Sequence, residues 1–334
     1  MTGRLITALL LVVAHIPVLA ADRTLTLAAW NIEHLAADDG KGCRPRAAAE
    51  YEAIKRYLKR AGADIIAFQE VENLRAARKV FPASDYDVHI SERPTRKFPE
   101  CYGMSENRLM QRTGFAVRKD LTARLGIKAV RQPDVKDLQG AHDAGRWGVY
   151  LILERVGPGS AGSMLMLPAL HLLSIHLKSR CTYQAVTGKK TRRDCALLYG
   201  QVNALSDWVN ARSRLKQDFI IAGDFNRQLD QLSDEVWLRL ESGGKSGRYV
   251  DLEKVLHGIE HPRPYNPKYP YAIDHVIYNQ SVDGLVLETE AFFDTRAAKY
   301  SDHLPLFATL DWSDSGGDTT ARRLPPCNCG DKAH

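Results

Sequence analysis

Long apolar runs are almost missing from this sequence of 334 residues, and beyond residue 20 no stretch is apolar enough to cross a bilayer. Excess charge of one sign is also missing, because 46 Lys and Arg residues face 40 Asp and Glu residues, for a formal net charge of +6. This near balance argues against a strongly charged scaffold. A mildly basic balance suits a polyanionic substrate, and it equally suits a functionally neutral solvated surface.

The one apolar run lies at the N-terminus. Residues 1–20 have a short basic start that ends at Arg4, an apolar stretch from Leu5 to Ala14, and small residues up to Ala20. This order is typical of a secretory signal peptide cleaved after Ala20, although a retained membrane anchor is the alternative. No Cys follows the cleavage site, which argues against a lipoprotein. We therefore expect a secreted or periplasmic protein.

Cysteines are few, and their even number suits an oxidising compartment. The six are Cys43, Cys101, Cys181, Cys195, Cys327 and Cys329. Sequence leaves their pairing open. Cys181 and Cys195 flank a short basic loop between a predicted strand and a predicted helix, so we predict a disulfide between them, with Cys43–Cys101 as a companion pair. The Cys327-Asn-Cys329 segment has no second ligand pair nearby, which argues against a metal site there.

No internal repeat is visible, and predicted strands outnumber predicted helices. Apolar alternation or short apolar runs predict strands at 25–30, 64–68, 113–117, 147–153, 170–175, 218–222, 275–278 and 307–310. Helical spacing of apolar residues predicts helices at 47–61 and 195–212. This count fits two packed sheets with helices outside. The domain is expected to span residues 21–312, and the polar residues 313–334 are expected to form a flexible tail.

Five of the predicted strands carry polar residues at or near one end. These residues are Asn31, Glu70, His176, Asp224, Asn226, Asp302 and His303. Phosphodiester hydrolysis needs carboxylates to hold a hard cation, a group that activates water, donors to the phosphate oxygens and an acid for the leaving oxygen. Taken singly, each residue could be a turn former, a rim carboxylate or a structural histidine. Taken together, the set supplies every part of that chemistry.

The motifs that contain these residues have a recognisable order. The segments WNIEHL, DIIAFQEVEN, SIHLKS, IIAGDFNRQ, AIDHVIYN and YSDHLPLFATL resemble the successive motifs of the endonuclease/exonuclease/phosphatase superfamily, which includes deoxyribonuclease I-like enzymes. The resemblance covers about residues 24–312 and suggests a secreted bacterial-type member. It implies an α+β fold, a four-layer α/β/β/α sandwich of two packed, mainly antiparallel sheets.

The resemblance also implies roles for residues of this chain. Glu70 would be the principal ligand of Mg²⁺, with Mn²⁺ as a substitute, and Asn31 and Asp302 would lie beside the metal. Asp224 would activate water, while Asn31, Arg146 and Asn226 would bind the phosphate. His176 would donate to a phosphate oxygen, and His303 would be paired with Asp274. Which histidine acts as the acid stays open. A tyrosine that many nuclease members have before the 113–117 strand cannot be aligned, since Tyr102 is only nearby.

Three functions are consistent with these residues. The first is a secreted, Mg²⁺-dependent nuclease that cuts DNA, and possibly RNA, by direct attack of water, and it leaves endo- and exonuclease action open. The second is a lipid or small-molecule phosphoesterase, similar to sphingomyelinases, for which the tyrosines of 265–271 are a candidate membrane contact. The third, a non-catalytic binding protein, is disfavoured by the complete set of polar residues. We expect a nucleic-acid partner, no stable membrane association, no protein partner and a monomer.

A basic segment follows the SIHLKS motif. Its cations are Lys178, Arg180, Lys189, Lys190, Arg192 and Arg193. They could track the phosphates of a nucleic acid, or they could form a solubilising loop.

Overall fold

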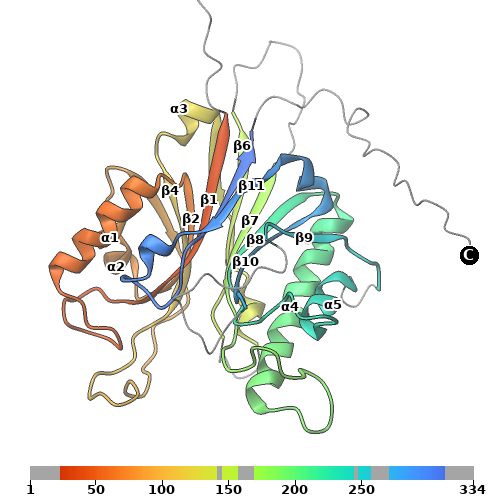
Figure 1. Cartoon of the computed structure of the whole chain (residues 1–334), viewed down its shortest axis with the longest axis horizontal. Helices are drawn as coiled ribbons and strands as arrows, with labels where there is room; N and C mark the ends of the chain where they lie inside the picture. The colour runs from red at the N-terminus through yellow and green to blue at the C-terminus, as the bar shows by residue number, and fades with distance from the viewer. Residues whose placement is uncertain (1–22, 141–144, 157–168, 244–246, 257–270, 313–334) are drawn as a thin grey trace, which may run out of the picture.

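The computed structural model describes residues 23–140, 145–156, 169–243, 247–256 and 271–312 (Figure 1). The expected signal peptide, the expected C-terminal tail with Cys327 and Cys329, and the tyrosines at 265 and 269 lie outside these residues. Within the described ranges, no helix has both the length and the apolar character that a membrane span requires.

Two six-stranded sheets form the centre of the molecule. The first has the order β11-β12-β1-β2-β4-β3, with β1 Thr24–Leu35, β2 Ile65–Val71, β3 Tyr86–Ile90, β4 Arg112–Arg118, β11 Val286–Phe293 and β12 Leu306–Asp311. The second has the order β5-β6-β7-β8-β10-β9, with β5 Ile127–Arg131, β6 Val149–Arg155, β7 Leu170–His176, β8 Asp218–Asp224, β9 Leu252–Lys254 and β10 Asp274–Asn279. In each sheet one neighbouring pair is parallel, β1 with β2 and β7 with β8. The other pairs are antiparallel.

Helices cover the outer face of each sheet, so the fold has four layers (Figure 1). Helices α1 (Ala48–Ala61) and α2 (Leu74–Val80) pack on the first sheet, and α4 (Arg193–Arg214) and α5 (Glu235–Glu241) pack on the second. The helix α3 (Leu121–Leu125) and the 3₁₀ segments Lys136–Gln139, Gln280–Leu285 and Thr295–Ala297 are connections. The predicted α+β sandwich is therefore confirmed.

Alternation along the strands creates the layers. In β1, Leu25, Leu27 and Ala29 face the second sheet, whereas Ala28 and Trp30 face the helices. This division follows from the two-residue period of a strand, which points successive side chains to opposite faces. Helix α1 ends at Gly62, whose φ of 75° is the left-handed conformation that glycine adopts without strain.

The predicted strands and helices are all present, and most extend beyond their predicted ends. Four strands (β3, β5, β9 and β11) and three short helices (α2, α3 and α5) are additional. Each of the four additional strands lies at an edge of its sheet.

Two disulfides join loops at one end of the sandwich. Cys43–Cys101 links the segment before α1 to the segment between β3 and β4. Cys181–Cys195 closes a segment of 14 residues between β7 and α4. These are the two pairs that the sequence singled out.

A buried histidine lies behind the second sheet, away from the strand ends. His171 is 4% exposed and its Nδ1 lies 2.5 Å from the Tyr150 hydroxyl, which accepts a hydrogen bond from Arg212 Nη1 at 2.7 Å. A hydroxyl has one proton and two lone pairs, so the Tyr150 hydroxyl can donate to an unprotonated His171 Nδ1 while it accepts from Arg212. Burial, together with the charge of Arg212, lowers the pKa of His171 to about 4. His171 is therefore a structural, neutral histidine.

We predict that His171 makes the protein acid-sensitive. Between its unfolded pKa of 6.5 and its folded pKa of about 4, the unfolded chain binds a proton that the folded protein does not. The stability that His171 contributes is therefore complete above pH 6.5 and is lost as the pH falls through this window. His171→Asn keeps an acceptor near the Nδ1 position but does not titrate. Urea unfolding from pH 7.5 to 4.5 should give a shallower loss of unfolding free energy for the variant, and parallel curves for both proteins would contradict the prediction.

Candidate active site

The strand ends meet in one cleft between the two sheets. Pairing in register brings Asn31 of β1 beside Gln69 of β2, and His176 of β7 and Asp274 of β10 beside Asp224 of β8. The cleft has a volume of about 380 Å³. Its lining side chains are mostly charged or hydrogen-bonding, namely His34, Glu70, Arg108, Gln111, Arg146, His176, Lys178, Ser179, Arg180, Asp224, Asn226, Asp302 and His303.

Seven of the predicted site residues line this cleft, and the other two contact it from behind. Asn31 donates from Nδ2 to Asp224 Oδ2 at 3.1 Å, and Asp274 accepts from His303. Tyr102, by contrast, is fully exposed and does not line the cleft. The sequence therefore placed its candidate residues in one site.

Asp224 is the most enclosed carboxylate of the cleft. It is 1% exposed. Besides Asn31, it accepts hydrogen bonds from the backbone N–H of Asn226 at 2.7 Å and from Asn226 Nδ2 at 3.0 Å, and His176 Nε2 lies 3.3 Å from Oδ2. Burial, with the charge of Asp274, raises the pKa of Asp224 to about 7, although the positive charge of His303 acts in the opposite direction. A carboxylate with a pKa near neutrality can take up and release a proton at physiological pH.

His303 lies between two carboxylates. Its Nδ1 is 2.6 Å from Asp274 Oδ2, and its Nε2 is 3.8 Å from Asp224 Oδ2. Burial alone would lower the pKa of His303, but the charges of Asp274 and Asp224 outweigh burial and raise it well above its ordinary value. His303 is therefore an imidazolium held in a fixed orientation by Asp274.

His176 has the opposite protonation state, although it lies in the same cleft. It is 3% exposed, and its Nδ1 has no hydrogen-bond partner within the described part of the chain. Burial, with the charges of Arg146 and His303, lowers the pKa of His176 well below its ordinary value. The two histidines that the sequence could not distinguish thus differ in charge.

Glu70 lies on an unusual piece of backbone. Its φ of 61° is left-handed, as are those of Glu33 and His34 in the neighbouring irregularity of β1. Its Oε2 accepts from the backbone N–H of His34 at 3.1 Å. Burial would raise the pKa of Glu70, but the positive charges of His34, Arg146 and His303 hold it below its usual value, so the carboxylate is ionised.

A buried arginine fixes the irregular end of β1. Arg46 is 1% exposed and donates to four backbone carbonyls, those of Glu33 at 2.7 Å, Ile32 at 2.9 Å, Tyr300 at 2.9 Å and His34 at 3.4 Å. Burial lowers the pKa of this guanidinium to about 10, which still leaves it charged at neutral pH. Arg46 therefore ties the turn that carries His34 to the segment that precedes Asp302.

Four cations also line the cleft. Arg146 donates to Gln111 Oε1 and, at 3.4 Å, to the carbonyl of Leu177, while Arg108 precedes β4 of the first sheet and Lys178 and Arg180 follow β7 of the second. Sequence reasoning missed His34, Arg108 and Gln111. His34 lies within the WNIEHL motif, so a signal was present for it, whereas Arg108 and Gln111 carry no local pattern.

Two groups of side chains could hold a metal ion. The first consists of Glu70 and Asp302, with Asn31 beside Glu70. These are the oxygen donors that a hard divalent cation prefers. The second consists of Asp224, Asp274 and His303, whose ligand atoms lie within 4.8 Å of one another. In the second group, His303 Nδ1 is already bonded to Asp274, so this trio is better suited to handling a proton than to binding a metal.

The fold and the cleft together define a class of protein, a hydrolase in which buried carboxylates and imidazoles share a cleft with cations suited to phosphate. Residues 28–303 match the Endonuclease/Exonuclease/phosphatase family. The chain belongs to this family and is a metal-dependent phosphodiesterase. No curated protein sequence matches it.

Solved structures of the same fold are distant in sequence. The catalytic domain of human Nocturnin, solved with a bound sulfate anion, is 16% identical with a TM-score of 0.55, over 86% of this chain and 94% of that chain. The AP endonuclease LMAP from Leishmania major is 12% identical with a TM-score of 0.54, over 86% and 88%. An AP endonuclease from Archaeoglobus fulgidus is 13% identical with a TM-score of 0.52, over 86% and 99%.

The structure predicts that Asp274 sets the charge of His303. In Asp274→Asn the strongest influence that raises the pKa of His303 is removed, so the imidazole should lose its proton at a lower pH than in the native protein. NMR titration of the labelled histidine in excess chelator measures this directly. Asp283→Asn, at a carboxylate that accepts from the Tyr278 hydroxyl at 3.3 Å, is the matched control. An unchanged His303 titration in Asp274→Asn would contradict the assignment.

Proposed function

We propose that this chain is a secreted nuclease that hydrolyses phosphodiester bonds of DNA, and also of RNA, by direct attack of water. The observation that carries the proposal is the environment of Asp224, a carboxylate that is 1% exposed with a pKa raised to about 7. It lies beside an imidazolium and two amides, at the edge of a cleft that cations also line. Such a carboxylate suits the removal of a proton from water.

The two histidines take different parts in this proposal. His303, charged and oriented by Asp274, is the group that can give a proton to the leaving oxygen or hold a phosphate oxygen by charge. His176 is neutral and therefore has one N–H. Its Nε2 lies 3.3 Å from Asp224 Oδ2, so this N–H can donate to that carboxylate or, in its place, to a phosphate oxygen. Asn226 and Arg146 supply further donors on either side of the phosphate.

The residues present fit a divalent cation. Glu70 is ionised, and Asp302 shares the cleft with it. Together with Asn31, they would hold Mg²⁺, or Mn²⁺ in its place, which supplies charge neutralisation for the phosphate oxygens. In this structure, Asn31 Nδ2 donates to Asp224, and the Asn31 side chain is also bonded to Glu70. Asn31 thus keeps the metal-binding carboxylate and the water-activating carboxylate in fixed relation.

Two features support nucleic acid as the substrate, and the two disulfides support a location outside the cell. Arg108, Arg146 and Arg180 give the cleft more positive charge than one phosphate requires, as a polyanionic chain would need, while Lys178 is paired with Asp194 at 2.8 Å. Two of the similar structures described above are AP endonucleases. The two disulfides suit an oxidising compartment, in agreement with the signal peptide expected at residues 1–20.

Glu70→Gln keeps the shape of the side chain and removes the charge that would hold the cation. We expect the variant to need far more Mg²⁺ than the native enzyme, because one of its two carboxylate ligands has become neutral. Chelation should abolish turnover of the native enzyme, and Mg²⁺ or Mn²⁺ should restore it. Turnover of a chromogenic phosphodiester as a function of metal concentration makes the measurement, with Glu52→Gln on the exposed face of α1 as the control. Full activity in excess chelator would overturn the assignment.

The substrate is tested by a panel. Plasmid DNA, RNA, sphingomyelin and a chromogenic phosphodiester are incubated with the purified mature protein and Mg²⁺. We expect DNA, and RNA, to be cut, and Asp224→Asn or His303→Ala to lower the rate by at least about a hundredfold, the scale of a lost acid–base group. If sphingomyelin or a small ester is hydrolysed while DNA and RNA stay intact, the nuclease proposal is wrong and a lipid or small-molecule phosphoesterase replaces it.

A further inference from the structure

The loop 177–192, between β7 and α4, begins inside the cleft and leads away from it. Its first residues, Lys178, Ser179 and Arg180, line the cleft. Arg180 has a φ of 72° and an exposed side chain, so the chain turns sharply at the cleft mouth. From there the loop extends below the second sheet (Figure 1). Any polymer that leaves the cleft on this side must pass along the loop.

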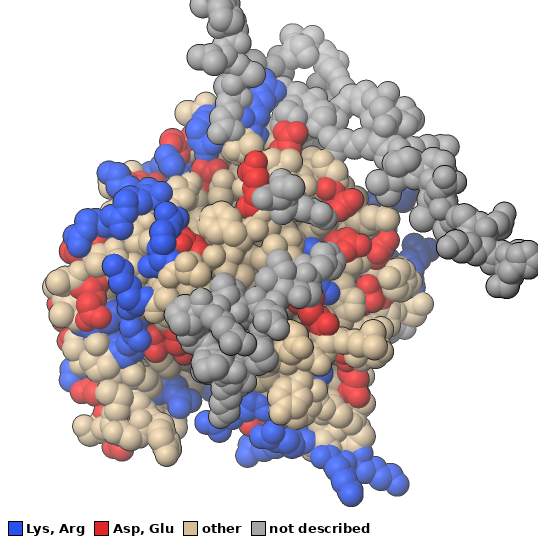
Figure 2. Space-filling model, in the orientation of Figure 1, with Lys and Arg blue, Asp and Glu red and all other residues tan. Residues whose placement is uncertain are grey.

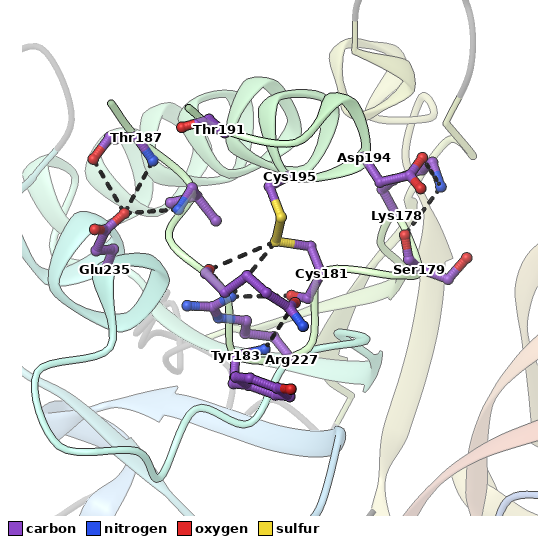
Figure 3. Close-up of a disulfide and its surroundings, with 12 residues drawn as sticks. Lys178, Ser179, Cys181, Tyr183, Thr187, Thr191, Asp194, Cys195, Arg227 and Glu235 are labelled. Carbon is purple, nitrogen blue, oxygen red and sulfur yellow. Dashed lines mark hydrogen bonds and ion pairs between the residues drawn. A yellow bond between two sulfur atoms is a disulfide. The ribbon is translucent and has the colours of Figure 1, made fainter. Parts of the chain in front are cut away.

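The base of the loop is firmly held. The Cys181–Cys195 disulfide ties it to α4 (Figure 3). Arg227, 2% exposed, donates to the carbonyls of Cys181 at 3.0 Å and Gln184 at 2.6 Å, while Asp234 neutralises it at 2.6 Å. An ordered arginine with this many fixed partners leaves the segment little freedom to move.

The middle of the loop has a second attachment. One carboxylate oxygen of Glu235, Oε2, accepts hydrogen bonds from the backbone N–H groups of Val186 at 2.8 Å and Thr187 at 3.1 Å, and from the Thr187 hydroxyl at 3.2 Å (Figure 3). Val186 itself is 2% exposed and packs in the core beneath α4 and α5. These contacts hold the loop in one conformation, and we call the loop a platform for this reason. A loop that served only solubility would not need such contacts.

On this platform an aromatic ring faces solvent. Tyr183 lies two residues after Cys181 and is 63% exposed, between the two attachment points. Four exposed cations, Lys189, Lys190, Arg192 and Arg193, follow along the same loop into the start of α4. In the described part of the chain none of the four forms an ion pair, and Lys and Arg are concentrated along the lower edge of the molecule, where this loop lies (Figure 2).

We propose that loop 177–192, with Arg193, binds an unpaired strand of nucleic acid as it leaves the cleft, with Tyr183 stacking on a base and the four cations following the phosphates. This inference rests on the proposed nuclease function. An exposed tyrosine on the same loop as several cations is a combination that binds single strands without reading sequence, because every base has a face to stack on. In a duplex those faces are covered by neighbouring bases, so the platform favours single-stranded over double-stranded substrate.

Binding is measured by fluorescence anisotropy of labelled oligonucleotides, in the Asp224→Asn background and excess chelator so that nothing is cut. Tyr183→Ala should weaken binding of single-stranded DNA about tenfold, the scale of one stacked base, and should weaken duplex binding much less. Tyr183→Trp should restore single-strand binding. Tyr249→Ala is the matched control, because Tyr249 is 64% exposed but lies outside both the loop and the cleft. Thermal unfolding of each variant checks that the fold is intact.

Salt dependence separates stacking from charge. Replacing Lys189, Lys190, Arg192 and Arg193 together by Gln should flatten the dependence of log Kd on log salt, since each contacted phosphate of a single strand adds about 0.7 to the slope. Tyr183→Ala should weaken binding without changing that slope. Replacing Arg56, Lys59 and Arg60 on α1, in the opposite outer layer, should leave the slope as it is.

The outcomes are distinguishable. If the native enzyme neither binds nor cuts nucleic acid, the proposed function and this inference both fail. If the native enzyme cuts DNA, but adding Tyr183→Ala to the Asp224→Asn protein leaves its binding of single-stranded DNA unchanged, this inference alone is overturned. Loss of binding to phosphatidylglycerol vesicles in Tyr183→Ala, with single-strand binding unchanged, would overturn it in favour of a membrane contact.

Discussion

The carboxylate of Asp224 is buried at the meeting point of the two sheets, and much of the site is arranged around that burial. An isolated carboxylate in such a place would be strongly destabilising, and it persists because partners surround it. Those partners are amides from Asn31 and Asn226 and imidazoles from His176 and His303, and within the described ranges no arginine or lysine forms a hydrogen bond or an ion pair with it. The amides and the neutral imidazole stabilise the charge less than an arginine would, and the imidazolium of His303 lies closer to Asp274 than to Asp224. The pKa of Asp224 is accordingly left near neutrality, where it is useful for moving a proton.

A glycine next to Asp224 permits close packing at this point of the structure. Gly223 precedes Asp224, and a Cβ at this position would lie 2.2 Å from the carbonyl of Ile175 and 2.9 Å from Gln69 Nε2. In addition, Gly223 has a φ of 145°, a backbone conformation that glycine adopts readily and other residues adopt rarely. The glycine of the GDFN motif is thus a packing requirement, chiefly because a side chain there would clash with the backbone of the neighbouring strand β7 and also with the Gln69 side chain of β2.

The centre of the fold could be predicted from sequence, but its edges could not. Interior strands such as β2 and β8 are buried on both faces and appear as short apolar runs. The four strands that were missed, β3, β5, β9 and β11, are the four edges of the two sheets. Edge strands have one free side and carry charged residues that discourage association, so their sequences resemble loops.

Likewise, the motif residues at the ends of interior strands were predictable, whereas Arg108 and Gln111 reach the cleft only through tertiary folding of a long loop. The charge difference between His176 and His303 was also beyond sequence, because it depends on which carboxylate each ring meets in space.

Both disulfides join segments that lie outside the two sheets. The proposed catalytic side chains stand on strand ends that are fixed by sheet hydrogen bonds and by apolar layers on both sides. The segments that complete the cleft, 91–111 and 177–192, lack sheet hydrogen bonds, and each is tied down by a covalent link, Cys43–Cys101 or Cys181–Cys195, in addition to the packing of a few buried side chains such as Val186. A cross-link of this kind stabilises a loop chiefly by limiting its alternatives when it is released. The cleft therefore has two kinds of support. Hydrophobic packing holds the strand ends that carry the proposed site, and disulfides help to hold the loops around it, so only the second kind depends on an oxidising environment.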